Sequence, residues 1–354
     1  MTTPPTDLPA AAPSAPDAPT ALPPATPARP ARMRAVVQDR YGSADVLRLD
    51  RIEPPAIGPA EVLIRVGAAG LDRGTWHLLT GRPYLMRVMG FGLRAPKDRV
   101  PGRDVAGTVV AVGSAVTRFA VGDEVYGVAR GSFAEFAAAP EGKLAHRPAA
   151  LSAREAAAVP ISASTALQAV QAGGVQAGQR VLVTGASGGV GSYAVQIATA
   201  RGARVTGVCS PAKADLVRSL GAVEVIDYTR EDFAGPGRVF DVILDIGGHP
   251  ALRRLRRALS SEGTAVIVGQ ETGGRWLGGF DRQLRALAWS PFVRQRFTML
   301  VSTEDHRHLL ELADLIESGA VRPALHRAYA LDEVPAALRD LEAGRIGGKA
   351  VIVP

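Results

Sequence analysis

A glycine-rich turn at residues 185–191 is the part of the sequence best suited to bind a nucleotide. It lies between a predicted strand, Arg180–Thr184, and a helix predicted over residues 192–200. Glycines let the backbone approach a pyrophosphate, and the N-terminus of the following helix presents N–H donors to its charge. The small-residue positions of a dinucleotide-binding fingerprint fall on Ala186, Gly188 and Gly191.

The end of the next predicted strand indicates which dinucleotide fits. Proteins that use NAD usually place an acidic residue about 20 residues after such a turn, where it holds the ribose 2′-hydroxyl. Here the strand ends at Val208, Cys209 and Ser210, with no acid. Ser210 and Lys213 can instead hold a 2′-phosphate by a hydrogen bond and by charge, which favours NADPH. The alternative is that Lys213 is a solvated residue on the first turn of a helix.

Strands and helices alternate along the second half of the chain, a pattern typical of a doubly wound parallel sheet. The first half has short strands closely punctuated by glycines, which predicts a small antiparallel barrel-like domain. We expect a helix to start at Ser302 with a capping box, and an irregular loop over residues 81–101. The predicted divisions are a disordered Pro/Ala-rich tail at 1–32, a barrel domain at 33–159, a nucleotide domain at 160–295 and a return to the barrel domain at 296–354.

Composition narrows the classes of partner and site. The chain has 354 residues, 47% hydrophobic, with a net charge of +7 that is spread along the sequence, so a nucleic-acid partner is permitted without being indicated. Its one cysteine, Cys209, excludes an intramolecular disulfide and a thiolate zinc cluster, and suits a reducing cytoplasm. The sequence has no uninterrupted run of about 18 apolar residues, so we expect no membrane-spanning helix.

Several motifs together resemble the medium-chain dehydrogenase/reductase superfamily, in its zinc-independent quinone-oxidoreductase branch. The resemblance covers residues 33–354 and implies a GroES-like β-barrel catalytic domain with a Rossmann cofactor domain. The motifs are the run 100–109, the turn 185–191 with Tyr193, Ala194 and Gln196, the stretch 220–228 and the strand Phe240–Asp245. Zinc-using relatives have a cysteine ligand aligned with residues 70–72 and Gly-His-Glu where this chain has Gly102, Arg103 and Asp104. The resemblance therefore implies a site with no metal.

By resemblance, the branch uses NADPH to reduce quinones or the activated C=C bond of α,β-unsaturated carbonyls. Hydride addition leaves negative charge on the carbonyl oxygen, which needs hydrogen-bond donors and a proton. The cofactor contacts that alignment carries over are Thr165, Gly188, Gly189, Val190, Ser210, Lys213, Tyr228 and, on the terminal strand, Lys349.

Three residues are candidates at the substrate end. Asp72 replaces an asparagine that relatives place beside the nicotinamide. Tyr84 is the candidate proton donor, with packing under the 81–101 loop as the alternative role. Arg103 is expected to fill the space of the absent zinc by pairing with Asp104 or another carboxylate.

Two other functions remain open from the residues alone. An NADPH-dependent carbonyl or aldehyde reductase would differ only in the shape of its pocket. A nucleotide- or RNA-binding protein with little turnover would use the arginines of residues 253–257, which otherwise coat an exposed helix. The family further implies a homodimer, with the strand around 264–269 and the region 275–300 as candidate contacts.

Overall fold

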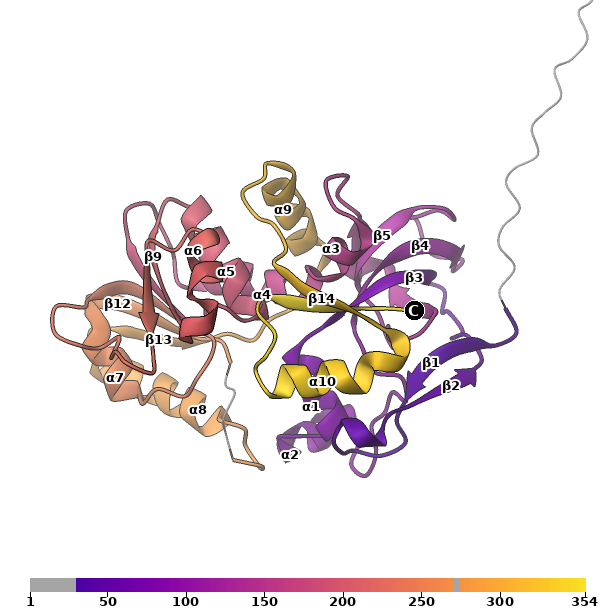
Figure 1. Ribbon diagram of the computed structural model, residues 1–354, viewed down its shortest axis with the longest axis horizontal. Helices are drawn as coiled ribbons and strands as arrows, with labels where there is room; N and C mark the ends of the chain where they lie inside the picture. The colour runs from indigo at the N-terminus through magenta and orange to yellow at the C-terminus, as the bar shows by residue number, and fades with distance from the viewer. Residues whose placement is uncertain (1–29, 270–273) are drawn as a thin grey trace, which may run out of the picture.

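The computed structural model describes residues 30–269 and 274–354. Most of the predicted tail therefore lies outside the described residues. Two units lie side by side in Figure 1, a parallel sheet with its helices on the left and a barrel-like sheet on the right. Helix α4 (Pro160–Ala172) and the C-terminal segment lie between them.

The barrel unit is built around β3 (Glu61–Leu71), which pairs with β4, β6 and β15 in antiparallel register. Alternate β3 residues Val62, Ile64 and Val66 point into the barrel core, as the period of two in a strand requires. The other strands of this unit are β1 (Met33–Val37), β2 (Arg48–Ile52), β4 (Asp104–Val112), β5 (Glu124–Val128), β6 (Phe136–Pro140), β7 (Leu144–His146), β14 (Leu325–Ala330) and β15 (Lys349–Val353).

The parallel sheet has the strand order β10-β9-β8-β11-β12-β13. The order reverses direction between β8 and β11, and such a switch point is where doubly wound sheets bind ligands. Its strands are β8 (Arg180–Thr184), β9 (Arg204–Cys209), β10 (Glu224–Asp227), β11 (Phe240–Asp245), β12 (Leu259–Ile267) and β13 (Arg296–Met299). β12 pairs with strands on both sides, so residues 264–267 are not at an edge of the sheet, and β13, which lies within the other candidate region 275–300, ends the sheet on that side.

Helices cover both faces of the parallel sheet, so its central strands are buried and nearly all apolar. Val181 and Val183 of β8 pack into one core cluster, while Leu182 packs into the other. The remaining helices are α1 (Arg73–Thr80), α2 (Tyr84–Met86), α3 (Ala153–Ala157), α5 (Gly189–Ala200), α6 (Ala214–Ser219), α7 (Leu252–Ala258), α8 (Phe280–Trp289), α9 (His306–Glu317) and α10 (Val334–Glu342).

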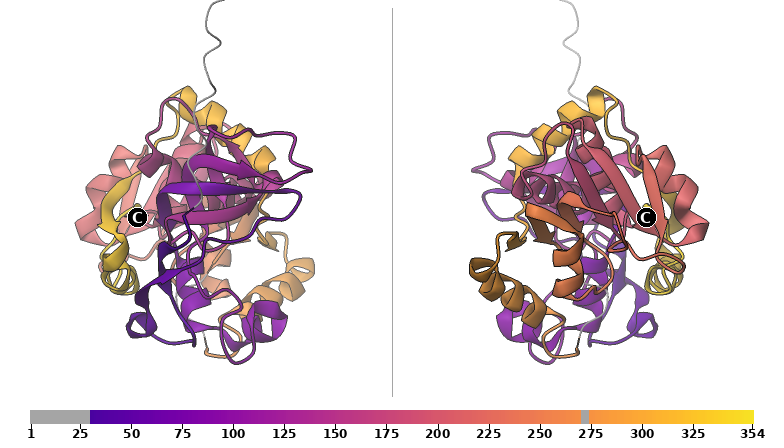
Figure 2. Two further views of the ribbon diagram at one scale, coloured as in Figure 1. Left: turned by 90° about the vertical axis from the view of Figure 1, so that its right-hand side faces the viewer. Right: turned by 90° about the vertical axis from the view of Figure 1, so that its left-hand side faces the viewer.

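The C-terminal segment returns to the barrel, where β14 and β15 extend its sheet. In both views of Figure 2 this yellow segment lies along one side of the molecule. The helix expected to start at Ser302 starts instead at His306, because Asp305 caps it by accepting a hydrogen bond from the Arg307 N–H at 2.8 Å. Ser302 and Thr303 bond to Gln168 of α4 instead.

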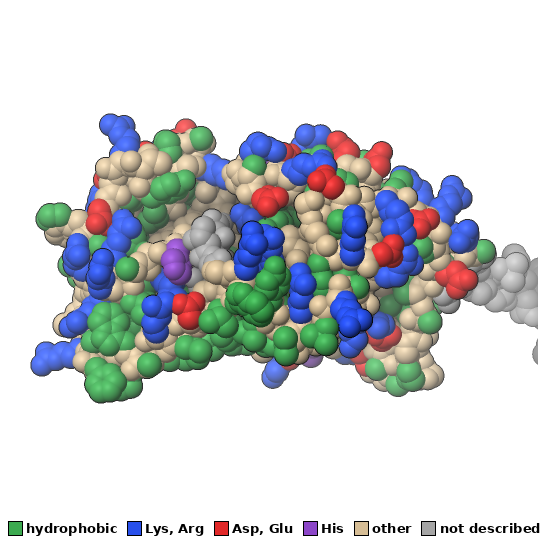
Figure 3. Space-filling model, turned by 90° about the horizontal axis from the view of Figure 1, so that it is seen from below, with side chains coloured by type: hydrophobic (Ala, Val, Ile, Leu, Met, Phe, Trp, Pro, Cys, Tyr) green, Lys and Arg blue, Asp and Glu red, His purple; other side chains and the backbone are tan. Residues whose placement is uncertain are grey.

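The segment 81–101 is more ordered than the predicted irregular loop. It contains α2 and a π-helical turn, Arg87–Phe91, and it lies with α8 at the bottom of Figure 1. Seen from below, apolar side chains lie among arginine and lysine side chains (Figure 3). Val88 and Leu93 of this segment and Trp276 before α8 are exposed apolar residues. Within the described residues, we find no helix of the length and apolar character that crossing a bilayer requires.

Candidate active site and cofactor cleft

The turn after β8 has the shape that a pyrophosphate site needs. Gly185 adopts a positive φ of 66°, and a Cβ there would lie 2.8 Å from the Cα of Gly247. A Cβ on Gly191 would lie 2.1 Å from the Gly185 carbonyl oxygen, so only glycine allows the helix to pack against the turn. Ala186 is fully buried and its N–H donates to the Val208 carbonyl at 3.0 Å. Ala186 and Gly191 thus shape the turn.

Gly188 and Gly189 line a cavity of about 560 Å³ at the start of α5, which we call the nucleotide cavity. Here the first N–H groups of α5, including that of Val190, have no partner inside the helix. Three further predicted cofactor residues line the same cavity: Ser210, Lys213 and Tyr228. The structure therefore brings the predicted glycines and the predicted phosphate-binding residues together.

The nucleotide cavity has a cationic lining. Arg73, Lys213 and Arg254 line it together with His249, and the lining residues that the structure describes include no aspartate or glutamate. The Lys213 ammonium donates to the carbonyl oxygens of Gly344 and Ile346, both at 2.7 Å, which fixes its position at the wall. Such a lining attracts phosphate groups and offers no carboxylate to a ribose hydroxyl.

One wall of the nucleotide cavity was missed by the sequence reasoning. Gly247 and His249 follow β11, and a buried Asp245–Arg282 ion pair of 2.5 Å lies beneath them. Asp245 also accepts from the Thr184 hydroxyl, which in turn accepts from the Ile246 N–H. Burial raises the pKa of Asp245, and the Arg282 guanidinium partly offsets this effect. The sequence could have indicated Gly247 and His249, because they follow the carboxyl end of β11, the strand that pairs with the one before the glycine turn.

Arg254, one of the arginines considered for the RNA-binding alternative, has partners within the protein. Its guanidinium is 2.9 Å from the Asp232 carboxylate and lies over the Phe233 ring, and it lines the nucleotide cavity. Arg256 lies over the Trp289 ring. At least these two arginines of residues 253–257 therefore have intramolecular partners.

Thr165 does not line the nucleotide cavity. It lines a separate cavity of about 200 Å³, the Thr165 cavity, and its hydroxyl donates to the Ile161 carbonyl at 2.7 Å. Ser302 and Thr303 line the same cavity, and Gln168 fixes them: its Nε2 donates to the Thr303 carbonyl, and its Oε1 accepts from the Thr303 N–H, both at 3.0 Å. Hydrogen bonds from Gln168 therefore hold the segment that follows β13 against α4 at this cavity.

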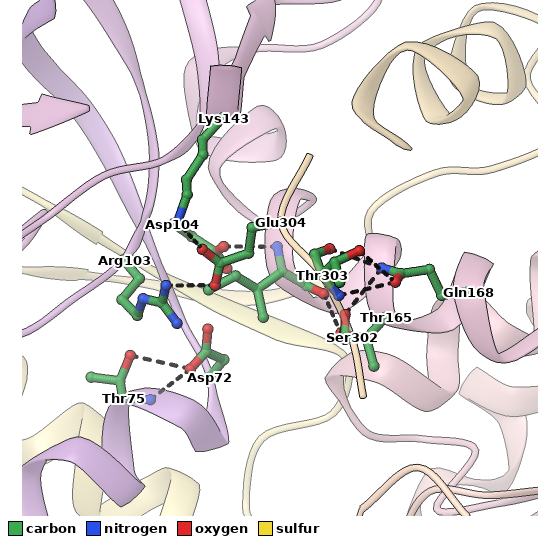
Figure 4. Close-up of polar contacts among 11 residues, drawn as sticks. Asp72, Thr75, Arg103, Asp104, Lys143, Thr165, Gln168, Ser302, Thr303 and Glu304 are labelled. Atoms are coloured by element: carbon green, nitrogen blue, oxygen red, sulfur yellow. Dashed lines mark hydrogen bonds and ion pairs between the residues drawn. The ribbon is translucent and has the colours of Figure 1, made fainter. Parts of the chain in front are cut away.

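Arg103 lies at the boundary of the Thr165 cavity and a third one. The third, of about 340 Å³, is lined by Gln38 and Gly102 among others, and we call it the Gln38 cavity. Arg103 and Lys143 line both. As Figure 4 shows, both side chains point to Glu304: Arg103 Nη2 is 2.5 Å from Oε1 and Lys143 Nζ is 2.8 Å from Oε2. The expected pairing of Arg103 is therefore with Glu304 rather than Asp104.

Asp104, the next residue, points to the opposite side of the strand. It is fully buried, with Oδ2 3.1 Å from Lys349 Nζ and Oδ1 accepting from the Ile161 N–H at 2.9 Å. Burial raises the pKa of Asp104 to about 6, although Lys349 opposes the shift. Lys349 also donates to the Ser162 hydroxyl and packs its stem near Gly189, so its ammonium group lies under the turn rather than in the nucleotide cavity.

Asp72 and Tyr84, the predicted catalytic residues, have different surroundings. Asp72 is buried and caps α1, with Oδ1 accepting from the Thr75 N–H at 2.7 Å, while its Oδ2 has no hydrogen-bond partner among the described residues. Figure 4 shows its hydrogen bonds with the N–H and the hydroxyl of Thr75. Tyr84 packs edge-on against Trp276 at 5.3 Å, with the Arg87 guanidinium over its ring, and lines none of the three cavities. The structure does not bring Tyr84 to the others.

The donor atoms at the aligned zinc-ligand positions do not fit zinc. Arg103 supplies a cation there, and Asp104 is already paired with Lys349. Across residues 30–269 and 274–354, no three His, Cys, Asp or Glu side chains are grouped so as to hold a metal ion.

Comparisons with known proteins agree with this architecture. The family described as "Alcohol dehydrogenase GroES-like domain" matches residues 58–149, and that described as "Zinc-binding dehydrogenase" matches residues 220–352. Among solved structures, the quinone oxidoreductase of Coxiella burnetii superposes with a TM-score of 0.80 at 26% identity, covering 91% of this chain and 99% of that one.

Curated relatives are similar over nearly the whole chain. The mitochondrial NAD(P)H oxidoreductase RTN4IP1 of Mus musculus is 33% identical, covering 90% of this chain and 89% of its own length. The 2-methylene-furan-3-one reductase of Solanum lycopersicum is 34% identical, covering 91% and 79%. The chloroplastic quinone-oxidoreductase QR1 of Triphysaria versicolor is 32% identical, covering 91% and 98%. This chain therefore belongs to the medium-chain dehydrogenase/reductase superfamily, in its quinone-oxidoreductase-like branch.

Proposed function

We propose that the protein is an NADPH-dependent oxidoreductase that reduces quinones or the activated C=C bond of α,β-unsaturated carbonyls without zinc. Relatives named as quinone oxidoreductases and as an enone reductase support this substrate class. The observation that carries the cofactor choice is the nucleotide cavity, where a glycine turn meets Ser210, Lys213 and Arg254 and where none of the described lining residues is an aspartate or glutamate.

The residues divide the task between the cavities. The first N–H groups of α5 bind the pyrophosphate, and Ser210 with Lys213 binds the 2′-phosphate. Thr165 and the segment fastened by Gln168 position the nicotinamide end. The dihydronicotinamide supplies a hydride when bound. Asp72 caps α1 on the barrel side, its Oδ2 has no hydrogen-bond partner among the described residues, and with Tyr84 it stays a candidate for contact with the substrate.

Metal-free turnover tests the proposal directly. The EDTA-treated protein should oxidise NADPH with 1,4-benzoquinone, 9,10-phenanthrenequinone or a simple enone, and NADH much more slowly. An aldehyde acceptor in the same series tests the carbonyl-reductase alternative. Activity lost with EDTA and restored by zinc would contradict the proposal, as would no oxidation of NADPH with any quinone or enone.

Lys213 tests the cofactor choice separately. Lys213→Met should weaken NADPH binding by about 10-fold or more, because it removes a charge-assisted contact, while NADH binding stays nearly unchanged. Fluorescence titration of both cofactors measures this. Arg48→Met, which breaks an exposed pair with Asp39 outside the nucleotide cavity, is the matched control. Equal losses for NADPH and NADH would show that Lys213 serves only the fold.

We also propose a homodimer in a reducing compartment, with cytoplasm as the expected location. The contact would use the outer edge of β13, because that strand ends the parallel sheet. The buried Cys209 suits such a compartment.

A further inference from the structure

The Arg103 cluster keeps a positive charge where two cavities meet. Two cations, Arg103 and Lys143, share one carboxylate, that of Glu304. All three side chains are partly exposed, at 33%, 38% and 21%, so the cluster faces the cavities rather than the core. The ion pair between the Arg103 guanidinium and Glu304 uses one nitrogen, Nη2. A guanidinium has five N–H donors, so others are available to a ligand.

The local backbone directs Arg103 to this boundary. Gly102 adopts a φ of 92°, and a Cβ there would lie 2.6 Å from the Ser132 hydroxyl and 2.5 Å from the Phe133 ring. The Arg103 carbonyl accepts from the Ala129 N–H at 2.8 Å, which fixes the start of β4. The side chain therefore leaves a tightly held segment of backbone.

Glu304 is fixed from the other side of the cleft. It follows Thr303, which Gln168 holds to α4, the helix that carries Thr165. The orientation of Arg103 is thus tied to the residue proposed to position the nicotinamide end. A donor with fixed orientation stabilises a developing charge better than a mobile one, because it needs no reorganisation during the reaction.

We infer that Arg103 is a catalytic residue that donates hydrogen bonds to the acceptor's carbonyl oxygen, and that Glu304 and Lys143 are its positioning residues. This rests on the proposed function. Hydride adds to the β-carbon of the enone, the C=C electron pair shifts to form the enolate C=C bond, and the C=O electron pair moves onto oxygen. Arg103 stabilises that oxyanion, and the α-carbon then takes one proton from water. For a quinone, the same contact stabilises the phenolate-type oxygen.

The first test needs no turnover. At a pH where it is ionised, p-nitrophenolate carries a delocalised oxyanion, and nitrobenzene is its neutral counterpart. In calorimetric titrations of the protein alone, Arg103→Met should weaken p-nitrophenolate binding by about 10-fold or more and leave nitrobenzene binding unchanged. Arg339→Met is the matched control, since its pair with Asp45 is also 2.5 Å but lies outside the three cavities. Equal phenolate binding by the wild type and Arg103→Met would overturn the inference.

The second test uses the reaction. Loss of an oxyanion donor should lower kcat by about 10² to 10³, with the affinity for NADPH unchanged. Arg103→Lys should restore part of the rate, because lysine keeps the positive charge but lacks the planar set of N–H donors of the guanidinium. Glu304→Gln, which keeps Arg103, should lower kcat more than it raises KM. A wild-type rate in Arg103→Met would overturn the inference. No turnover by the wild type would overturn the proposed function instead, and p-nitrophenolate binding would still decide the role of Arg103.

Discussion

Arg103 and Asp104 are neighbours in the sequence, yet their charges lie in different environments. Asp104 is fully buried and pairs with Lys349, which is 1% exposed, at the junction of β4, β15 and α4. Arg103 pairs with Glu304 at a cavity boundary, where both side chains keep contact with solvent. Removing one partner of a buried ion pair leaves the other charge in the core without compensation. Removing one partner of an exposed pair leaves a charge that water can solvate. The comparison fits a structural role for Asp104 and the catalytic role that we propose for Arg103.

The largest effect on stability is expected from Lys349→Met. It leaves the Asp104 carboxylate unpaired in the core, so the free energy of unfolding at pH 7.5 should fall by about 3–5 kcal/mol. Urea unfolding followed by circular dichroism measures this. The double variant Asp104→Asn with Lys349→Met should recover part of the loss, because no charge then remains unpaired. A loss below about 1 kcal/mol, the range of exposed pairs, would remove the contrast.

The pH dependence of stability should follow Asp104. Its pKa in the folded protein, about 6, lies above the unfolded value, so its contribution to stability is full below about pH 4 and is lost as pH rises through 6. The wild type should lose up to about 1.4 kcal/mol per pH unit in this range relative to Asp104→Asn. Unfolding curves of both proteins from pH 4 to 8 give the difference. Parallel pH profiles would show that Asp104 titrates normally.

The smallest effect is expected from Glu304→Gln. Its partners are 33% and 38% exposed, so solvent screens the pair and stability should change by less than about 1 kcal/mol. The same urea titration measures it, with Arg339→Met as the reference for an exposed arginine pair. A loss as large as that of Lys349→Met would mean that the Arg103 cluster holds the fold together.

Local sequence predicted the nucleotide cavity well. The glycine turn, Ser210 and Lys213 lie within a strand-turn-helix-strand unit whose geometry is set by neighbouring residues. The sequence predicted a carboxylate partner for Arg103 without showing that it is Glu304. It could not show the Asp104–Lys349 pair, because these residues lie 245 positions apart in the sequence. The packing of Tyr84 against Trp276 could not be predicted for a similar reason, since Trp276 lies far along the chain in the other unit. The helix start was misjudged because Gln168, on another helix, takes the hydrogen bonds of Thr303.

The chain crosses between the two units twice, once through α4 and once through the segment after β13, and Gln168 joins these crossings. The C-terminal segment adds further links, because the Gly348 N–H donates to the Ser187 carbonyl at 2.8 Å. On the lower face, the N–H groups of Tyr84 and Leu85 donate to the carbonyls of Arg275 and Trp276 at 2.8 and 3.1 Å. The two units are therefore joined by backbone hydrogen bonds on this face as well as by the two crossings of the chain.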